Sequence, residues 1–152
     1  MKEYLDFILP GFTKDGIKQF HLKEYVEKSN VVLAFFPGAW TKVCIEEMCI
    51  IRDDMKDYEK LDATVFGISV DMPWAQNKFT EDQKLTFQLL SDANKKVIND
   101  YNVVWEDLAG IKNVANRALF IIQKETGKII YQWVGENPGQ IPPFDEAKKV
   151  LT

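Results

Sequence analysis

The sequence is poor in side chains that bind transition metals, since its 152 residues include two cysteines, Cys44 and Cys49, and one histidine, His21. A tetrahedral zinc site needs more nitrogen and sulfur ligands than these residues supply. We therefore expect neither a metal ion nor another cofactor. Because His21 lies in a polar segment far from Cys44 in the chain, we expect an ordinary surface residue there rather than half of a catalytic cysteine–histidine pair.

Excess positive charge and long apolar runs are also lacking. The formal net charge is −4, so the sequence offers no basic surface for nucleic acid. No apolar run approaches the roughly 20 residues that a membrane helix requires. The first residues include an acid, Glu3, and no long apolar stretch, unlike a secretory signal. We expect a cytoplasmic protein without a membrane partner, whose cysteines are reactive or buried rather than joined in a permanent disulfide.

The chain has the length and composition of one soluble globular domain, residues 1–152, with 46% apolar and 28% charged residues. Apolar runs alternate with segments of helical periodicity. We expect strands at residues 31–36, 64–70, 85–90, 118–122 and 129–134, and helices at residues 21–28, 41–60, 73–84, 93–101 and 144–151. We expect Asp71 and Ser91–Asp92 to cap two of these helices, and residues 102–116 to be irregular.

The order of these elements predicts the fold. Strand–helix–strand units come first and imply parallel pairing with right-handed crossovers. A hairpin and a helix come last, and the hairpin adds antiparallel strands. We therefore expect an α/β fold of the thioredoxin-like type, with a mixed central sheet flanked by helices on both faces and an insertion at residues 71–116.

The residues around Cys44 carry the chemical signal. Pro37 and Gly38 stop the apolar run at residues 31–36, and a helical pattern begins near Thr41. Apolar side chains then recur on one face of that helix, at Cys44, Met48, Ile51, Met55 and Tyr58. A helix start stabilises an anion, and the reactive form of cysteine is an anion, the thiolate. A helix start and a nearby cation together can lower the pKa of a thiol from ~8.5 to about 3.5–7.5. The alternative is that Cys44 is only a small buried residue of this face.

Pro37, Thr41 and Cys44 are spaced as P-x-x-x-T-x-x-C, which resembles the active-site signature of the peroxiredoxins, thiol peroxidases on a thioredoxin fold. Asn116–Phe120 resembles the second signature of that family, an arginine at the start of a strand, here Arg117. The resemblance covers nearly the whole chain, with further matching segments at Leu5–Phe12, Ser69–Asp71 and Leu89–Asp92.

The resemblance implies a role for each site residue. Cys44 would be the peroxidatic cysteine, Thr41 would hydrogen-bond the peroxide, and Pro37 would shield the thiolate from water. Arg117 would stabilise the thiolate and the polarised peroxide, and Glu47 corresponds to an acid that helps hold the arginine. Glu47 and the preceding glutamate favour the helix start yet raise the pKa of a nearby thiol, so Arg117 must offset them. The alternative for Arg117 is a surface residue at a strand end.

Cys49 follows Cys44 by five residues, which in an intact helix gives about 7.5 Å of rise and ~140° of rotation. The Cα atoms would then lie roughly 8–9 Å apart, beyond the ~7 Å limit for a disulfide. The spacing resembles the PrxQ branch, also called bacterioferritin comigratory protein, in which this cysteine resolves the sulfenic acid as an intramolecular disulfide. Leu108–Ile111 and Gly135–Gly139 look more like the AhpE branch. The alternative is a one-cysteine peroxidase with a structural Cys49.

The resemblance implies a peroxidase that reduces hydrogen peroxide and alkyl hydroperoxides, with a thioredoxin-like or glutaredoxin-like dithiol as reductant. A general thiol–disulfide oxidoreductase is a second candidate, although its C-x-x-C motif is missing. A non-enzymatic binding module is a third. In this family the segments that carry Trp40, Trp74 and Trp105 meet near the active site. We therefore expect a monomer or a homodimer formed through that face, unless each tryptophan packs within its own domain.

Overall fold

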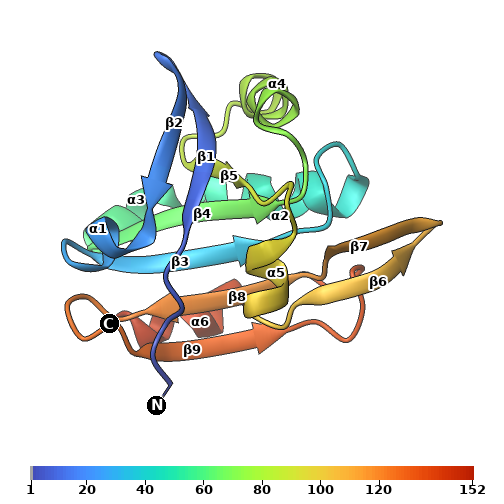
Figure 1. The fold of residues 1–152 in the computed structure, drawn as a ribbon. Coiled ribbons are helices and arrows are strands. Elements are labelled where there is room, and N and C mark those ends of the chain that lie inside the picture. Colours follow the sequence, from blue (N-terminus) through green and yellow to red (C-terminus); the bar gives the residue numbers. More distant parts are fainter. Residues whose placement is uncertain (1) are drawn as a thin grey trace.

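The computed structural model describes residues 2–152. Its centre is a five-stranded sheet in the order β5-β4-β3-β8-β9 (Figure 1). The strands are β3 (Asn30–Phe35), β4 (Ala63–Ser69), β5 (Gln88–Ser91), β8 (Ala118–Ile122) and β9 (Ile129–Val134). β4 pairs in parallel with β3 and β5, whereas the β3–β8 and β8–β9 pairs are antiparallel. The predicted mixed sheet is therefore confirmed.

β3 occupies the middle of the sheet because its side chains are apolar on both faces. All of residues 31–35 are buried, as expected for a strand that is covered on both sides. Successive side chains point to opposite faces of a sheet. Accordingly, Leu33 and Phe35 enter one core cluster, while Val32 and Ala34 enter the other.

Helices cover the sheet on both faces (Figure 1). One face carries α2 (Lys42–Asp53), α3 (Met55–Lys60), α4 (Pro73–Gln83) and α6 (Phe144–Val150). The other face carries α1 (Leu22–Val26), α5 (Lys96–Asp100) and a hairpin of β1 (Ile8–Thr13) and β2 (Gly16–His21). Within residues 2–152, none of these helices is both long and apolar enough to cross a membrane.

The single helix predicted at residues 41–60 is wrong, because α2 and α3 are separate helices that meet at Asp54. Asp54 has φ −96° and ψ 3°, whereas helical ψ is about −42°. Its N–H is shared between the Ile50 and Ile51 carbonyls, at 3.1 Å each, as is common where a helix ends. The predicted apolar face nevertheless continues across it, because Ile51 and Tyr58 are both buried.

Residues 102–116 were expected to be irregular but contain an antiparallel hairpin of β6 (Val104–Leu108) and β7 (Ile111–Ala115). Ala109 and Gly110 join the strands with φ values of 52° and 91°, as in a two-residue type I′ turn. The usual Asn-Gly signal for such a turn is missing, and few side chains of these strands are buried. The hairpin could therefore not be predicted from the sequence pattern. Figure 1 shows β6 and β7 projecting from the body of the protein.

Two further elements are shorter than predicted. The strand expected at residues 85–90 is β5, and the helix expected at residues 93–101 is α5. The Asp92 carboxylate accepts hydrogen bonds from the backbone N–H groups of Val97 at 3.2 Å and Ile98 at 2.8 Å. Asp92 therefore satisfies two of the first N–H groups of α5, as predicted, but from several residues upstream, because the N-cap residue is Lys95. The prediction that Ser91 takes part in the cap is wrong, because its hydroxyl donates to the Asp71 carbonyl.

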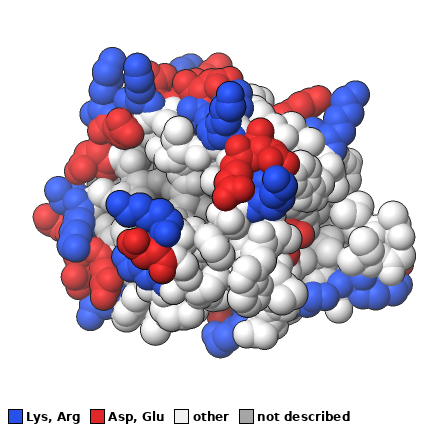
Figure 2. All heavy atoms as spheres, turned by 90° about the horizontal axis from the view of Figure 1, so that it is seen from above, with Lys and Arg blue, Asp and Glu red and all other residues white. Residues whose placement is uncertain are grey.

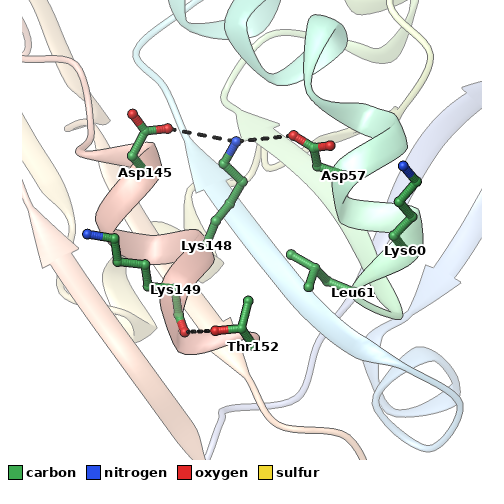
Figure 3. Close-up of a pocket in the computed structure, with 7 residues that line it drawn as sticks. All are labelled: Asp57, Lys60, Leu61, Asp145, Lys148, Lys149 and Thr152. Carbon is green, nitrogen blue, oxygen red and sulfur yellow. Dashed lines mark hydrogen bonds and ion pairs between the residues drawn. The ribbon is translucent and has the colours of Figure 1, made fainter.

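The C-terminal helix α6 packs against α3 beside an open pocket of about 290 Å³. Figure 3 shows Lys148 of α6 pointing toward Asp57 of α3 and Asp145 of its own helix, with its Nζ 3.5 Å and 3.8 Å from their carboxylates. None of the candidate site residues lines this pocket. Its ion pairs therefore belong to the packing of α6.

Candidate active site

Cys44 lies where the central strand passes into a helix. β3 ends, Pro37 and Gly38 turn the chain, and α2 begins with Thr41 as its N-cap residue. Cys44 is in the first turn of α2, where backbone N–H groups lack helical partners and the macrodipole is positive. The side chains of Cys44 and Pro37 are buried, whereas Thr41 is exposed.

The sulfur of Cys44 accepts a hydrogen bond from Arg117, whose Nη2 atom lies 3.0 Å from Sγ. Thr41 and the Gly38 backbone lie close enough to the sulfur to lower the pKa of the thiol. The Thr41 hydroxyl itself donates to the Gly38 carbonyl at 3.4 Å. Arg117 comes from 73 positions away, and it reaches the site because Ala118, the next residue, opposes Phe35 in the antiparallel β3–β8 pair.

Arg117 is held from several sides and is 2% exposed. Its Nε donates to the Pro138 carbonyl oxygen at 2.6 Å, and its Nη1 lies 3.4 Å from Glu47 Oε1. Its backbone N–H donates to Asn116 Oδ1 at 2.8 Å, and Asn116 Nδ2 donates to the Gly135 carbonyl at 2.7 Å. Asn116 and Pro138 were not predicted as supporting residues, and their one signal is that they lie in segments resembling the peroxiredoxins.

Glu47 follows Cys44 by one turn of α2, and its side chain is fully buried. Burial raises the pKa of Glu47 to about 8, although the charge and hydrogen bond of Arg117 lower it. Within residues 2–152, Glu47 Oε2 has no hydrogen-bond partner, which also favours the neutral acid. A neutral Glu47 opposes a thiolate less strongly at neutral pH than the ionised glutamate predicted from the sequence.

Burial raises the pKa of the Cys44 thiol above its ordinary value, and this effect exceeds the lowering by the charge of Arg117 and by the Thr41 and Gly38 hydrogen bonds. The expectation of a lowered pKa, drawn from the helix start and a nearby cation, is therefore wrong for this closed arrangement. The reason is that the sulfur has lost its contact with water, which disfavours the charged form. Formation of the thiolate then depends on Arg117, Thr41 and Gly38, which lower the pKa.

Cys49 is not brought to Cys44. Both thiols are free, and the half-buried Cys49 has its Sγ 3.7 Å from Gln83 Oε1 at the end of α4. The Gln83 carbonyl also accepts a hydrogen bond from Arg52 Nη1 at 2.6 Å. This side of α2 is thus fastened to α4, and the helix is intact between the two cysteines.

The loop before α2 is fastened to the end of β4. The Ala39 N–H and the Ser69 hydroxyl each donate to Asp71 Oδ2 at 2.7 Å. The prediction that Asp71 caps a helix is wrong, because the N-cap residue of α4 is Met72 and it makes no side-chain cap hydrogen bond. The carboxylate of Asp71 is directed at the loop that carries the site.

No cluster of three or more His, Cys, Asp or Glu side chains within residues 2–152 is placed to hold a metal ion. The imidazole of His21 lies 2.5 Å from the Asp6 carboxylate, and both side chains are partly exposed. His21 therefore makes a surface contact with Asp6 and takes no part in the arrangement around Cys44.

The surface beside the site loop is apolar. Trp40 is 46% exposed, Met72 57% and Trp74 59%, whereas Trp105 is half-buried. Met72 and Trp74 line an open groove of about 440 Å³ between the start of α4 and the β1–β2 hairpin. Figure 2 views the molecule from above Figure 1, and it shows a broad uncharged area with charged side chains gathered mainly around its rim.

The arrangement is suited to nucleophilic displacement on a small polar substrate. A buried sulfur supplies the nucleophile, and its donors are already fixed by the fold. Where negative charge develops on a leaving atom, donors that need no rearrangement lower the barrier. Arg117 can contribute in this way because one nitrogen of its planar fork faces the sulfur while another faces Glu47.

Comparison with known proteins gives consistent likenesses. Residues 2–132 match the model of the AhpC/TSA family. The chain is 34% identical over 135 residues to peroxiredoxin Bcp of Bacillus subtilis, across 84% of this chain and 80% of that protein. It is 39% identical over 128 residues to a chloroplastic 2-cysteine peroxiredoxin of Chattonella marina var. antiqua, across 76% of this chain. The chain spans 63% of the length of that relative and 40% of two further chloroplastic 2-Cys peroxiredoxins.

A solved structure agrees with these sequence likenesses. The fold is similar to that of peroxidoxin BcpB from Mycobacterium tuberculosis, with a TM-score of 0.84 and 30% identity over 99% of this chain and 94% of that one. The predicted thioredoxin-like fold is therefore confirmed. The similarity to Bcp and BcpB also agrees with the bacterioferritin comigratory protein branch that the cysteine spacing resembles.

Proposed function

The chain belongs to the AhpC/TSA family, and from this premise we propose that it is a thiol-dependent peroxidase that reduces hydrogen peroxide and alkyl hydroperoxides. The observation that carries the proposal is the hydrogen bond from Arg117 Nη2 to Cys44 Sγ at 3.0 Å in a buried site. Cleavage of an O–O bond by a thiolate needs fixed donors near the leaving oxygen. Disulfide exchange at an exposed C-x-x-C motif, or binding of a partner, needs no such arginine.

Cys44 is the peroxidatic residue in this proposal. Its thiolate attacks one peroxide oxygen, so an S–O bond forms as the O–O bond breaks. The sulfur is oxidised to a sulfenic acid, and the leaving oxygen departs with the electron pair and takes a proton to become an alcohol or water. Arg117 and Thr41 donate hydrogen bonds to the peroxide as this charge develops, Pro37 shields the thiolate, and Glu47 helps hold Arg117.

Cys49 then resolves the sulfenic acid as an intramolecular disulfide. The Cys49 thiol attacks the Cys44 sulfur, an S–S bond forms, and the sulfenic hydroxyl leaves as water. Five helical steps separate the Cα atoms by roughly 8–9 Å, so the first turns of α2 must unwind and Cys49 must leave Gln83. In the alternative, a one-cysteine peroxidase, α2 stays folded and an external thiol reduces the sulfenic acid.

The disulfide needs an external reductant to restore both thiols. We propose a thioredoxin-like or glutaredoxin-like dithiol, which is oxidised to its own disulfide as the Cys44–Cys49 bond is reduced. This supply of dithiol fits the cytoplasmic location that we also propose, because thiols are kept reduced there.

The proposal is tested by peroxide consumption with a thioredoxin system as electron donor. Trp40, four residues before Cys44 in the sequence, should report oxidation of the sulfur in stopped-flow fluorescence. We expect Cys44→Ser to abolish both signals and Cys49→Ser to keep the first rapid oxidation while losing turnover. Insulin disulfide reduction without peroxide turnover would instead support an oxidoreductase, and neither activity would support a binding module.

Mass spectrometry after one equivalent of peroxide tests the second cysteine separately. We expect the wild type to lose two hydrogens and to give a crosslinked peptide that joins Cys44 to Cys49. A persistent sulfenic or sulfinic acid on Cys44 without that crosslink contradicts the resolving role and leaves the one-cysteine alternative.

We propose that the protein is a monomer or a homodimer. The homodimer would form through the apolar surface around Trp40, Met72 and Trp74. The exposed fractions of these side chains support the dimer, because large apolar side chains are enriched in protein interfaces. Sedimentation of the wild type and of Trp74→Ala distinguishes the two states. A wild type that remains monomeric at high concentration removes the dimer.

A further inference from the structure

The loop between β3 and α2 carries Gly38 and Thr41, which lie beside the Cys44 sulfur and lower the pKa of its thiol. The Thr41 hydroxyl donates to the Gly38 carbonyl at 3.4 Å. Between these two residues lies Ala39, whose backbone N–H donates to Asp71 Oδ2 at 2.7 Å. Asp71 belongs to the segment that follows β4, 32 positions away. The conformation of the donor loop is thus tied to a residue on a neighbouring strand end.

The loop is held in a strained conformation. Trp40 has a φ of 73°, in the left-handed region that a bulky side chain rarely adopts. Such strain persists only where the surrounding contacts determine the conformation. Two contacts do so here: the Ala39–Asp71 hydrogen bond on one side, and the Trp40 ring packed edge-on against Phe79, with centroids 5.4 Å apart.

Asp71 is itself fixed by a polar network rooted in two strands and a helix. The Ser69 hydroxyl donates to Asp71 Oδ2, and the Ser91 hydroxyl donates to the Asp71 carbonyl at 2.6 Å. Gln76 of α4, which is 1% exposed, donates to Ser69 Oγ at 2.9 Å and to the Leu90 carbonyl at 2.8 Å. The carboxylate therefore has little freedom to follow the loop if the loop moves.

From these contacts we propose that Asp71 is a positioning residue for the peroxide reaction. By accepting the Ala39 N–H, it holds the loop in the strained conformation that keeps Gly38 and Thr41 beside Cys44, where they can donate to an incoming peroxide. It touches neither the sulfur nor the substrate, and it acts through the loop alone. This inference rests on the proposed peroxidase function.

The test compares two reactions of the same sulfur. The rate with hydrogen peroxide depends on where the loop places Gly38 and Thr41, whereas alkylation by iodoacetamide depends on the thiolate and on access to the buried sulfur. The ratio of the two rates therefore removes any effect of the variant on the thiolate fraction. A variant that merely loosens the fold should lower the ratio by speeding alkylation, whereas a misplaced loop should lower it by slowing the peroxide reaction itself.

Four variants complete the design. Asp71→Ala removes the acceptor, and Asp71→Asn keeps an oxygen that can accept the Ala39 N–H without the charge. Asp71→Ser is too short to reach Ala39 and serves the same purpose if the alanine variant does not fold. Asp107→Ala is the matched control, because the Asp107 carboxylate also accepts a backbone N–H, that of Gly110 at 2.7 Å, but in the β6–β7 hairpin.

We expect the ratio to fall at least ~10-fold in Asp71→Ala and Asp71→Ser, and to stay near the wild-type value in Asp71→Asn and Asp107→Ala. A wild-type ratio in the alanine and serine variants overturns the inference, as does an equal loss in Asp71→Asn, which would make the charge and not the hydrogen bond responsible. The wild type separates this inference from the proposed function. If Cys44 of the wild type reacts with peroxide no faster than a small free thiol, it is the peroxidase proposal that fails.

Discussion

The Nη2 atom of Arg117 lies 3.0 Å from the Sγ atom of Cys44, and both side chains are almost completely buried. A hydrogen bond from a charged group is stronger where water is excluded. The same guanidinium is also fixed by the Pro138 carbonyl and by Glu47, so it cannot leave the sulfur without breaking these contacts. A mutation of Arg117 should therefore change the rate at which Cys44 reacts with peroxide.

Replacing Arg117 with lysine keeps the positive charge but loses the planar fork that faces Cys44 and Glu47 together. We expect the second-order rate constant for oxidation of Cys44 by peroxide to fall by roughly a factor of 100. Stopped-flow fluorescence measures it. Arg52→Lys is the matched control, because Arg52 bonds to Gln83 and not to the sulfur. An undiminished rate in Arg117→Lys would remove the arginine from the mechanism.

Because burial raises the pKa of the Cys44 thiol, the thiolate fraction should still be growing at alkaline pH. We expect the peroxide rate to increase with pH through and beyond the ordinary cysteine pKa of about 8.5. Thr41→Val removes a hydrogen bond that lowers this pKa, so its profile should move to higher pH. Thr152→Val, which loses an exposed hydroxyl, serves as control. A profile that is already flat at neutral pH would contradict the direction of the shift.

Glu47 has a pKa of about 8 in the folded protein, against an ordinary value of 4.5. A carboxylic acid with a raised pKa stabilises the fold fully below its unfolded value and loses this contribution as pH rises through the folded value. We expect the free energy of unfolding to fall from pH 4.5 to about 8, by on the order of a few kcal/mol. In Glu47→Gln this decline should be shallower.

Urea unfolding at a series of pH values measures the effect of Glu47. Glu46→Gln is the matched control, because Glu46 is the preceding residue and its side chain is exposed. It should follow the wild-type curve. If the free energy of unfolding falls with pH as steeply in Glu47→Gln as in the wild type, Glu47 is ionised in the folded protein from pH 4.5 to about 8.

Lys148 joins α6 to the break between α2 and α3, with its Nζ 3.0 Å from Asp54 and 3.5 Å from Asp57. Its side chain is 18% exposed, so solvent screens these pairs less than at an open surface. We expect Lys148→Met to lower the free energy of unfolding by about 1 kcal/mol, with an unchanged peroxide rate. The neighbouring Lys149→Met is the control in urea unfolding. Equal free energies of unfolding in Lys148→Met and Lys149→Met would show that the ion pairs of Lys148 do not stabilise the fold.

Several elements could be predicted because their signals are local. The apolar run at residues 31–36 identifies β3, and Pro37 with Gly38 identifies where it stops. The hairpin at residues 104–115 could not be predicted in this way, because few of its side chains are buried and its turn is Ala-Gly. The break at Asp54 was missed because the apolar pattern continues across it, with Ile51 and Tyr58 both buried.

The candidate site divides in the same way. Cys44 was identified from its place at a predicted helix start, and Thr41, Arg117 and Glu47 from a family resemblance. Asp71 was assigned to the wrong partner, because an aspartate before a helix start is usually a cap. Its true contact, the Ala39 N–H, lies on a different loop.

The sequence by itself determined that a buried strand ends at a helix start with a cysteine in its first turn, because apolar spacing and chain-stopping residues act over a few positions. Only the tertiary structure decided what surrounds that sulfur. Arg117 and Asp71 reach the site through strand pairing and through contacts between distant segments. The direction of the Cys44 pKa shift depends on how completely the folded chain excludes water, and no local pattern records that.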